Sequence, residues 1–182
     1  MDHFLEEVVV KHKKGLNEVA YYFSWVLIVF TGLIAVMNLW TVFYMILGQV
    51  EFNLFAVIEL LVSGGVCAYT YLNHNKLRTE FEYTFTNGIM DFAQVFNNTK
   101  RKSLGSLDLK KIDAAGPVGT SAFQRYLSMK DVKQSQWFLN REANLVFFYF
   151  SKDSNKRIIV CEPSEEMVGL LKHYLPFGAW QE

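Results

Sequence analysis

The stretch VAYYFSWVLIVFTGLIAVMNLWTVFYMIL, from Val19 to Leu47, decides the architecture of this chain. It holds 29 consecutive residues without a formal charge. A helix needs about 20 apolar residues to cross the hydrocarbon core of a bilayer. A secretory signal peptide would instead have an apolar core of about 7–15 residues and a small-residue cleavage site. The run is too long for a signal peptide and predicts a transmembrane helix.

A second apolar run, from Phe52 to Leu72, begins after a link of residues 48–51 and contains one charge, Glu59. Such a short link makes the two helices antiparallel neighbours, because backbone inside lipid must satisfy its own hydrogen bonds. A core-buried helix pair in a soluble protein is the alternative, but neither run has a charged stripe at helical spacing. The sequence therefore predicts a transmembrane hairpin over residues 19–75, with spans at about 19–47 and 52–72.

Basic residues near the ends of the spans predict the orientation. Lys and Arg are enriched on the cytoplasmic side of membrane helices. The link between the spans has none, whereas the outer flanks carry Lys11, Lys13, Lys14, Lys76 and Arg78. We therefore expect a two-span protein of the cell membrane with both termini in the cytoplasm and the lipid bilayer as its first partner.

Small residues predict where the two spans approach each other. Reflecting the sequence about the centre of the link places small residues of both spans at similar depths. Small residues let helix backbones pack closely in lipid, where no hydrophobic force drives helices together. The expected packing residues are Gly32, Ala35, Gly64 and Ala68.

Glu59 is the one formally charged residue inside the spans. The same reflection places it near Thr41, with Asn38 about one turn deeper. An ionisable group in a span is costly and is by default a functional-site hypothesis. The alternatives are a glutamate close enough to the outer interface to reach water, or one held protonated by Asn38 or Thr41. The shallow position favours these structural alternatives over an ion or proton site.

After the spans the apolar pattern changes from continuous to alternating. Residues 80–86 alternate with a period of two, as a half-buried strand does. Asn87-Gly88 follows, the strongest short signal for a β-hairpin. Residues 89–96 form the returning strand, and a turn leads into a further strand over residues 103–112. These elements predict an antiparallel meander.

The rest of the chain predicts more strands and one helix. Residues 113–133 are less regular and fit a short helix or a loop. Further strands are expected at 136–141, 144–151 and 157–162. Ser164 opens a helix to about Leu175, because serine caps helices and the following acids suit the positive end of the helix dipole.

This order of elements gives the expected fold class and domain bounds. The class is an α+β membrane protein with an antiparallel, pleckstrin-homology-like β-rich domain closed by the C-terminal helix. A ferredoxin-like or other α+β domain is the alternative. The expected parts are a cytoplasmic N-terminal flank at 1–18, the hairpin, a cytoplasmic β-rich domain at 79–176 and a tail at 177–182.

Three segments carry a resemblance to a known family: YTFTNG from Tyr83, WFLNR from Trp137 and CEPSEE from Cys161. With them the chain resembles an uncharacterised family of small two-span membrane proteins of Gram-positive anaerobic bacteria that have a pleckstrin-homology-like C-terminal domain. The resemblance extends over nearly the whole chain. It implies the fold and brings no activity with it.

No pattern of catalytic or metal-binding residues stands out. The four histidines are scattered, and no HExxH motif or glycine-rich phosphate loop occurs. Cys67 and Cys161 are far apart, and Cys161 lies in an apolar strand, where a cysteine is usually a small core residue. Eighteen basic and eighteen acidic side chains balance to zero, and no basic face of the kind that binds nucleic acid is clustered. We expect no enzyme activity, no metal, no cofactor and no nucleic-acid partner.

Lys100, Arg101 and Lys102 form the one cluster with a functional interpretation, and Lys110 and Lys111 lie nearby in the sequence. Basic residues of a tethered domain can rest on anionic headgroups, whereas an isolated charge run is often only solvated surface. The leading hypothesis is a non-enzymatic interaction module whose cytoplasmic domain binds the inner leaflet or a protein partner. The alternative is an accessory subunit of a larger membrane complex that assembles through the hairpin.

Overall fold

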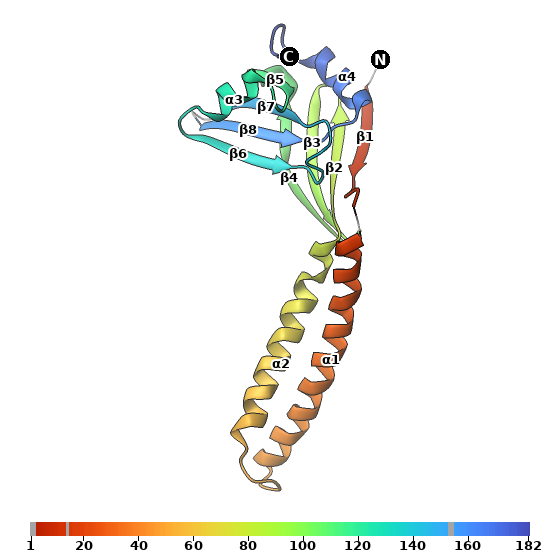
Figure 1. Ribbon diagram of the computed structural model, residues 1–182, viewed down its shortest axis with the longest axis vertical. Helices are drawn as coiled ribbons and strands as arrows, with labels where there is room; N and C mark the ends of the chain where they lie inside the picture. The colour runs from red at the N-terminus through yellow and green to blue at the C-terminus, as the bar shows by residue number, and fades with distance from the viewer. Residues whose placement is uncertain (1–2, 14, 153–154) are drawn as a thin grey trace. The chain divides into compact units, whose positions relative to one another are not determined.

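The computed structural model describes residues 3–13, 15–152 and 155–182. The chain divides into two compact units (Figure 1). One is helical and comprises Lys13–Arg78, and the other is β-rich and comprises Met1–His12 together with Thr79–Glu182. The helical unit is thus inserted into the chain of the β-rich unit.

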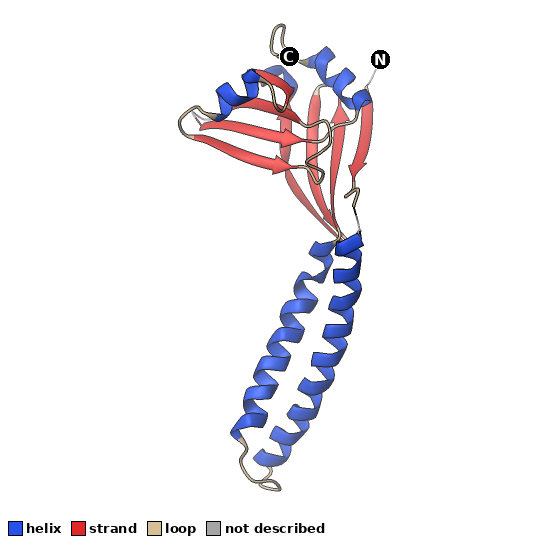
Figure 2. Cartoon of the chain, viewed as in Figure 1, coloured by secondary structure: helices blue, strands red, loops and turns tan. Residues whose placement is uncertain are grey.

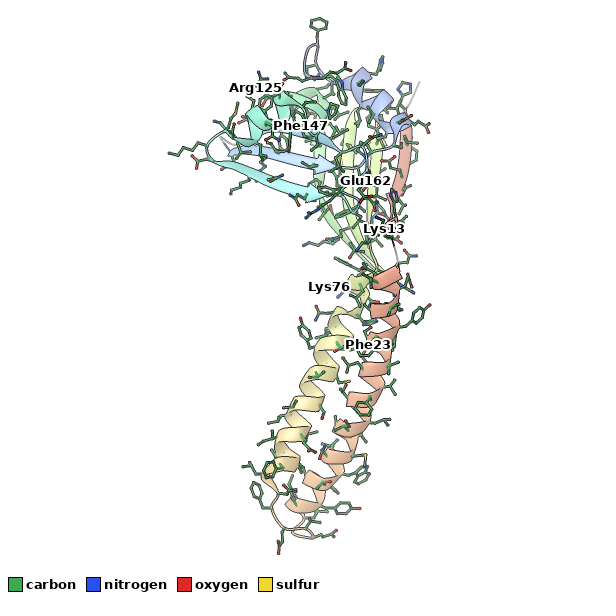
Figure 3. The ribbon with its side chains drawn as sticks, in the orientation of Figure 1. Lys13, Phe23, Lys76, Arg125, Phe147 and Glu162 are labelled. Atoms are coloured by element: carbon green, nitrogen blue, oxygen red, sulfur yellow. The ribbon has the colours of Figure 1, made fainter. Side chains whose placement is uncertain are left out.

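The helical unit is a hairpin of two long helices, α1 (Gly15–Ile46) and α2 (Leu54–Asn73), followed by the short 3-10 helix η1 (His74–Leu77). Asn53 caps α2, because its side-chain oxygen accepts a hydrogen bond from the Phe55 N–H at 3.0 Å. Apolar side chains project outward all along both helices (Figure 3). Both segments are long and apolar enough to cross a membrane, which agrees with the predicted hairpin.

The first sheet of the β-rich unit is antiparallel, with the strand order β1-β2-β3-β4. Its strands are β1 (Phe4–Val9), β2 (Thr79–Thr86), β3 (Ile89–Phe96) and β4 (Lys100–Asp108). The sequence analysis treated residues 1–18 as a flank outside the domain, and that was wrong. Phe4 pairs with Thr86 and Val9 with Phe81, so β1 is an edge strand of the sheet.

The hairpin of β2 and β3 follows the prediction closely. Phe81, Tyr83 and Phe85 alternate inward and are buried. Asn87 and Gly88 form the turn with φ values of 49° and 91°. Positive φ at both central residues defines the turn whose twist matches a β-hairpin.

The second sheet has the strand order β5-β7-β8-β6. Its strands are β5 (Ala114–Pro117), β6 (Val132–Trp137), β7 (Val146–Lys152) and β8 (Asn155–Cys161). β6 runs parallel to β8, and the other pairs are antiparallel. The strand expected at 136–141 lies earlier, at 132–137, and the irregular middle region also contains the short helix α3 (Ser121–Leu127).

Strand β7 and the second half of β8, in the second sheet (Figure 2), are buried on both faces. Phe148 and Ile159 face the main core, which they share with the first sheet. Phe147 and Ile158 face α3 on the other side. This explains the continuous apolar run in β7, since a strand covered on both faces does not alternate.

The C-terminal helix α4 (Glu165–Tyr174) closes the main core. The Ser164 side chain caps it by accepting a hydrogen bond from the Met167 N–H at 3.1 Å. Met167 and Leu171 are fully buried in the core. The expected cap is therefore present, and the helix buries one apolar face in the core.

The segment expected as a tail, 177–182, belongs to the domain. Ala179 is buried, and the segment pairs in parallel with β5 at Ala115. The Ala115 N–H donates to the Ala179 carbonyl and the Gln181 N–H donates to the Ala115 carbonyl, both at 2.8 Å. The edge of β5 is thereby covered.

Candidate membrane-facing surface and intramembrane groove

Lys100, Arg101 and Lys102 form the start of strand β4 rather than a turn, and we call them the basic strand start. All three are exposed. Lys100 pairs with Phe96, which in turn pairs with Thr79. The basic strand start therefore lies at the end of the first sheet where β1 ends and β2 begins, the end that carries both chain connections to the hairpin.

Two other features limit the charge at this surface. Arg101 forms an ion pair with Glu82 at 2.8 Å, so part of its charge is compensated. Lys110 and Lys111 follow the end of β4 and lie at the opposite end of the sheet, because Asp108 pairs with Ile89 beside the β2–β3 turn. Although these two lysines are near the cluster in sequence, the strand register separates them from it. Lys100 and Lys102 carry most of the available positive charge.

The polar residues predicted inside the spans come together in a groove of the hairpin. Asn38, Thr41 and Glu59 all line a cavity of about 830 Å³ between α1 and α2. Asn38 donates to the Ile34 carbonyl at 3.1 Å and Thr41 to the Met37 carbonyl at 3.2 Å. Both side chains thus bond to their own helix, and the Glu59 side chain is exposed.

The helices meet along a seam of small and hydroxyl side chains. Ser24 and Thr31 on α1 are buried, as are Ala56 and Ser63 on α2. The Ser24, Thr31 and Ser63 hydroxyls donate to carbonyls of their own helix at 2.5–2.7 Å, so they pack without unsatisfied polar groups. Small and hydroxyl residues are typical of helix contacts in lipid.

The predicted packing residues fall only partly on this seam. A Cβ on Gly32 would lie 3.6 Å from the Cys67 Sγ, so Gly32 faces α2. Gly64 faces open space, Ala35 is half-buried and Ala68 is exposed. The close approach expected at Gly64 and Ala68 is therefore absent. Ser24 and Thr31 are seven residues apart, as are Ala56 and Ser63, and residues at this spacing lie on the same face of a helix two turns apart. The reflection, which considered depth alone, did not use this spacing.

Gly32→Leu is expected to lower hairpin stability by about 1–3 kcal/mol, because the larger side chain overpacks against Cys67. Gly64→Leu is the matched control and should change little, since open space surrounds that position. The measurement is unfolding of the full-length protein in mixed micelles by added SDS, followed by helical circular dichroism. If both variants unfolded at the same SDS content, the proposed packing of Gly32 against α2 would be contradicted.

An ion pair joins the two helical segments at the open end of the hairpin. The Arg78 guanidinium lies 2.5 Å from the Glu18 carboxylate and 3.8 Å above the centre of the Tyr21 ring. The hydrogen bond to Glu18 is the main reason that the pKa of Arg78 is raised. The sequence alone did not predict that Glu18 and Arg78 form an ion pair.

A buried hydrogen-bond cluster holds the segment between β1 and the hairpin onto the β-rich unit. The Asn140 amide accepts from the His12 N–H at 2.8 Å and donates to the Val10 carbonyl at 2.9 Å. Asn140 also donates to the Glu162 carboxylate from its side chain at 2.8 Å and from its backbone at 3.0 Å. We call Asn140 and Glu162 the clamp (Figure 3 labels Glu162).

Tyr83 extends the clamp. Its hydroxyl donates to the Trp137 carbonyl and accepts from the Glu162 N–H at 3.3 Å. Burial raises the pKa of Tyr83 well above its usual range, so it remains a neutral donor. Sequence reasoning did not find the clamp, although its residues come from the three segments that carry the family resemblance.

A cavity of about 400 Å³ beside the clamp is lined by Glu7, His12, Glu162 and Glu165, among others. Burial raises the pKa of Glu7 despite its hydrogen bonds from the Ser164 backbone. Burial also raises the pKa of Cys161, so that thiol is unsuited to nucleophilic chemistry. Within residues 3–13, 15–152 and 155–182, no group of three His, Cys, Asp or Glu side chains could hold a metal ion.

Two sheets sharing one core, closed by a C-terminal helix, define a PH-like domain with a helical hairpin inserted between its first two strands. A family model described as "Bacterial PH-like domain (DUF6106)" matches residues 1–180. The chain belongs to this family, which confirms the fold expected from the resemblance. No curated protein and no solved structure matches the chain.

Proposed function

We propose that this protein is a membrane-anchored, non-enzymatic interaction module whose PH-like domain rests on the anionic cytoplasmic leaflet. The observation that carries the proposal is the position of the basic strand start. The chain leaves the first sheet after Val9 and returns at Thr79, and Lys100 lies at that same end. Short connections on both sides would keep this end within reach of the headgroups when the hairpin lies in a bilayer.

The expected strength of this contact fits an orienting role. A basic residue near an anionic surface contributes about 1 kcal/mol. The charge of Arg101 is partly compensated by Glu82, so Lys100 and Lys102 provide most of the binding free energy. That binding free energy is too small to recruit a soluble protein to the membrane. It is enough to orient a domain that is already tethered. The distribution of lysines and arginines around the spans supports cytoplasmic termini, which this contact requires.

The test uses the full-length protein in lipid nanodiscs, because the fragment 79–182 lacks strand β1. Hydrogen exchange at the β3–β4 turn should slow in discs with anionic headgroups relative to zwitterionic discs. Replacing Lys100 and Lys102 with Gln should remove the difference. Raising the salt from 0.01 M to physiological strength should also reduce it, since the Debye length falls from about 30 Å to about 8 Å.

Two controls accompany this experiment. Replacing Lys110 and Lys111 with Gln removes equal charge at the other end of the sheet and should leave the exchange pattern unchanged. Gln49→Cys in the link between the helices should react with an impermeant thiol reagent in intact cells. Equal exchange in both kinds of disc, or a link that is labelled only after cells are opened, would refute the proposed contact.

A second candidate function is assembly through the hairpin, as an accessory subunit of a larger membrane complex. The groove that contains Asn38, Thr41 and Glu59 supports it, because an exposed carboxyl in a span calls for a polar neighbour. Glu59→Leu should then reduce the size of the complex extracted from native membranes in mild detergent. Glu51→Leu, in the link, is the matched control and should not. An unchanged size for Glu59→Leu would remove this candidate.

A further inference from the structure

The groove between α1 and α2 has the dimensions of a site for a lipid acyl chain. Its volume is about 830 Å³, and ligand-binding pockets usually have about 300–1,000 Å³. It follows α1 from Thr41 to Thr31, a length of about 15 Å at the rise of an α-helix. Half of the hydrocarbon core of a bilayer, about 15 Å, has the same length. Met37, Ile58 and Val62 line the groove and are exposed, so it is open along its side.

The two ends of the groove differ in polarity. Asn38, Thr41 and Glu59 line the end nearest the link between the helices. Glu59 lies in the second turn of α2, about 8 Å along the axis from the first residue of that helix. Ile34 and Val66 line the end farther from the link. The groove thus has a polar end at a shallow depth and an apolar end deeper in the span, as an amphipathic ligand requires.

Two hydroxyl groups at the deeper end do not change this character. The Thr31 hydroxyl donates to the Leu27 carbonyl at 2.7 Å, and the Ser63 hydroxyl donates to the Glu59 carbonyl at 2.5 Å. Both side chains are buried. Their single protons are used within their own helices, so neither hydroxyl requires a polar partner from a ligand.

The hydrogen-bonding groups near the link select the kind of headgroup. Thr41 donates its one hydroxyl proton to the Met37 carbonyl at 3.2 Å, so only its oxygen lone pairs remain. Asn38 donates to the Ile34 carbonyl at 3.1 Å and keeps its side-chain oxygen as an acceptor. The Glu59 side chain is exposed, and an ionised carboxylate only accepts. This end of the groove therefore offers mainly acceptors and one negative charge.

A cation that carries N–H donors complements such an end. An unpaired carboxylate in a span is costly, and charge-assisted hydrogen bonds offset that cost. A second copy of the chain has no such cation at this depth, because Gly15–Ile46 and Leu54–Asn73 contain no Lys or Arg. A lipid headgroup with a primary ammonium supplies three N–H donors, as a lysine side chain does. The quaternary ammonium of choline has the same charge but no N–H.

We infer that the groove binds a phospholipid with a primary-amine headgroup, whose ammonium contacts Glu59 and whose acyl chain lies along Ile34, Val62 and Val66. The ligand belongs to the leaflet that faces the link. The inference rests on the proposed placement of the hairpin in a bilayer. It does not depend on the contact of Lys100 with anionic lipid, and it gives the groove a lipid occupant in place of a neighbouring subunit.

The test uses the full-length protein in nanodiscs that contain equal amounts of phosphatidylethanolamine and phosphatidylcholine with identical acyl chains. Native mass spectrometry of the protein released from the discs measures which lipid remains bound. Phosphatidylethanolamine should be retained about tenfold or more over phosphatidylcholine, because hydrogen bonds to a charged group are the stronger kind. The monomethyl and dimethyl derivatives keep the charge but lose N–H donors one at a time, so their retention should fall in that order.

Two pairs of variants locate the bound lipid. Glu59→Gln should remove the preference for phosphatidylethanolamine, whereas Glu51→Gln removes an equal charge from the link, outside the groove, and should keep it. Val62→Trp should fill the groove and reduce retention of the lipid. Leu61→Trp, at an exposed neighbouring position that does not line the groove, is its matched control and should not.

Several results would overturn the inference. Equal retention of the two lipids, or a preference that survives Glu59→Gln, would show that the carboxyl does not select an ammonium. A protein with a basic residue in its span that co-purifies through Glu59, with no lipid preference, would assign the groove to a subunit instead. Replacing Lys100 and Lys102 with Gln should leave the preference unchanged, so failure of the proposed leaflet contact and failure of this inference can be told apart.

Discussion

Asn140→Leu is expected to lower the free energy of unfolding of the PH-like domain by about 3 kcal/mol or more. The substitution keeps a similar volume but removes the amide that satisfies Glu162, the Val10 carbonyl and the His12 N–H. A buried carboxylate that loses a hydrogen bond retains its desolvation cost without compensation. Urea-dependent hydrogen exchange of strands β2 and β3 in the full-length protein measures the effect on this unit alone.

Two further variants make this prediction specific. Asn144→Leu changes an exposed asparagine of the same loop and should be nearly neutral. Asn140→Asp places a second carboxyl against Glu162, so it should destabilise strongly at neutral pH and less in acid, where one carboxyl can hold a proton. A change below 1 kcal/mol for Asn140→Leu would show that the clamp is not important for stability.

Leu171→Ala is expected to destabilise the same domain by about 2–5 kcal/mol, the usual cost of truncating a fully buried leucine. Leu171 lies in α4 and packs in the core between the two sheets. Gly169→Ala, on the exposed face of the same helix, should instead stabilise by about 1 kcal/mol, because glycine is a poor helix former. In the same hydrogen-exchange experiment, the free energy of unfolding should fall for Leu171→Ala and rise for Gly169→Ala. A neutral Leu171→Ala would mean that α4 does not close the core.

Local patterns were enough to predict much of the fold. The Asn87-Gly88 turn, the alternation in β2 and the cap at Ser164 depend on residues that are close in sequence. The two long helices follow from apolar length alone. These elements lie where the sequence analysis expected them, within a few residues.

Long-range pairing explains what the sequence analysis missed. Strand β1 contains two glutamates and pairs with residues more than seventy positions away, so nothing local distinguishes it from a charged flank. Asn140 and Glu162 look like ordinary turn residues until folding brings them together. The segment 177–182 is too short to predict as a strand, and only the edge of β5 gives it that role.

The candidate functional surfaces also depend partly on local sequence and partly on long-range pairing. Counting charges was enough to find Lys100, Arg101 and Lys102, but only the strand register places them at the end of the sheet that leads to the hairpin. The register also separates Lys110 and Lys111 from them. In the hairpin, reflecting the sequence identified Gly32 as a residue that faces the other helix, but it could not give the rotation of each helix about its axis, which turns Gly64 away.

The insertion of the hairpin between β1 and β2 also sets an order for biosynthesis. The ribosome makes β1 first, but its partner strand β2 emerges only after both apolar helices have been synthesised. Until then β1 has no neighbour to pair with, and the first sheet lacks one edge. If the hairpin is a membrane anchor, as we propose, chains whose helices fail to insert would expose apolar surface to water, and such species aggregate. The first sheet can therefore be completed only after both helices have been synthesised, so that folding of the domain depends on what becomes of the hairpin.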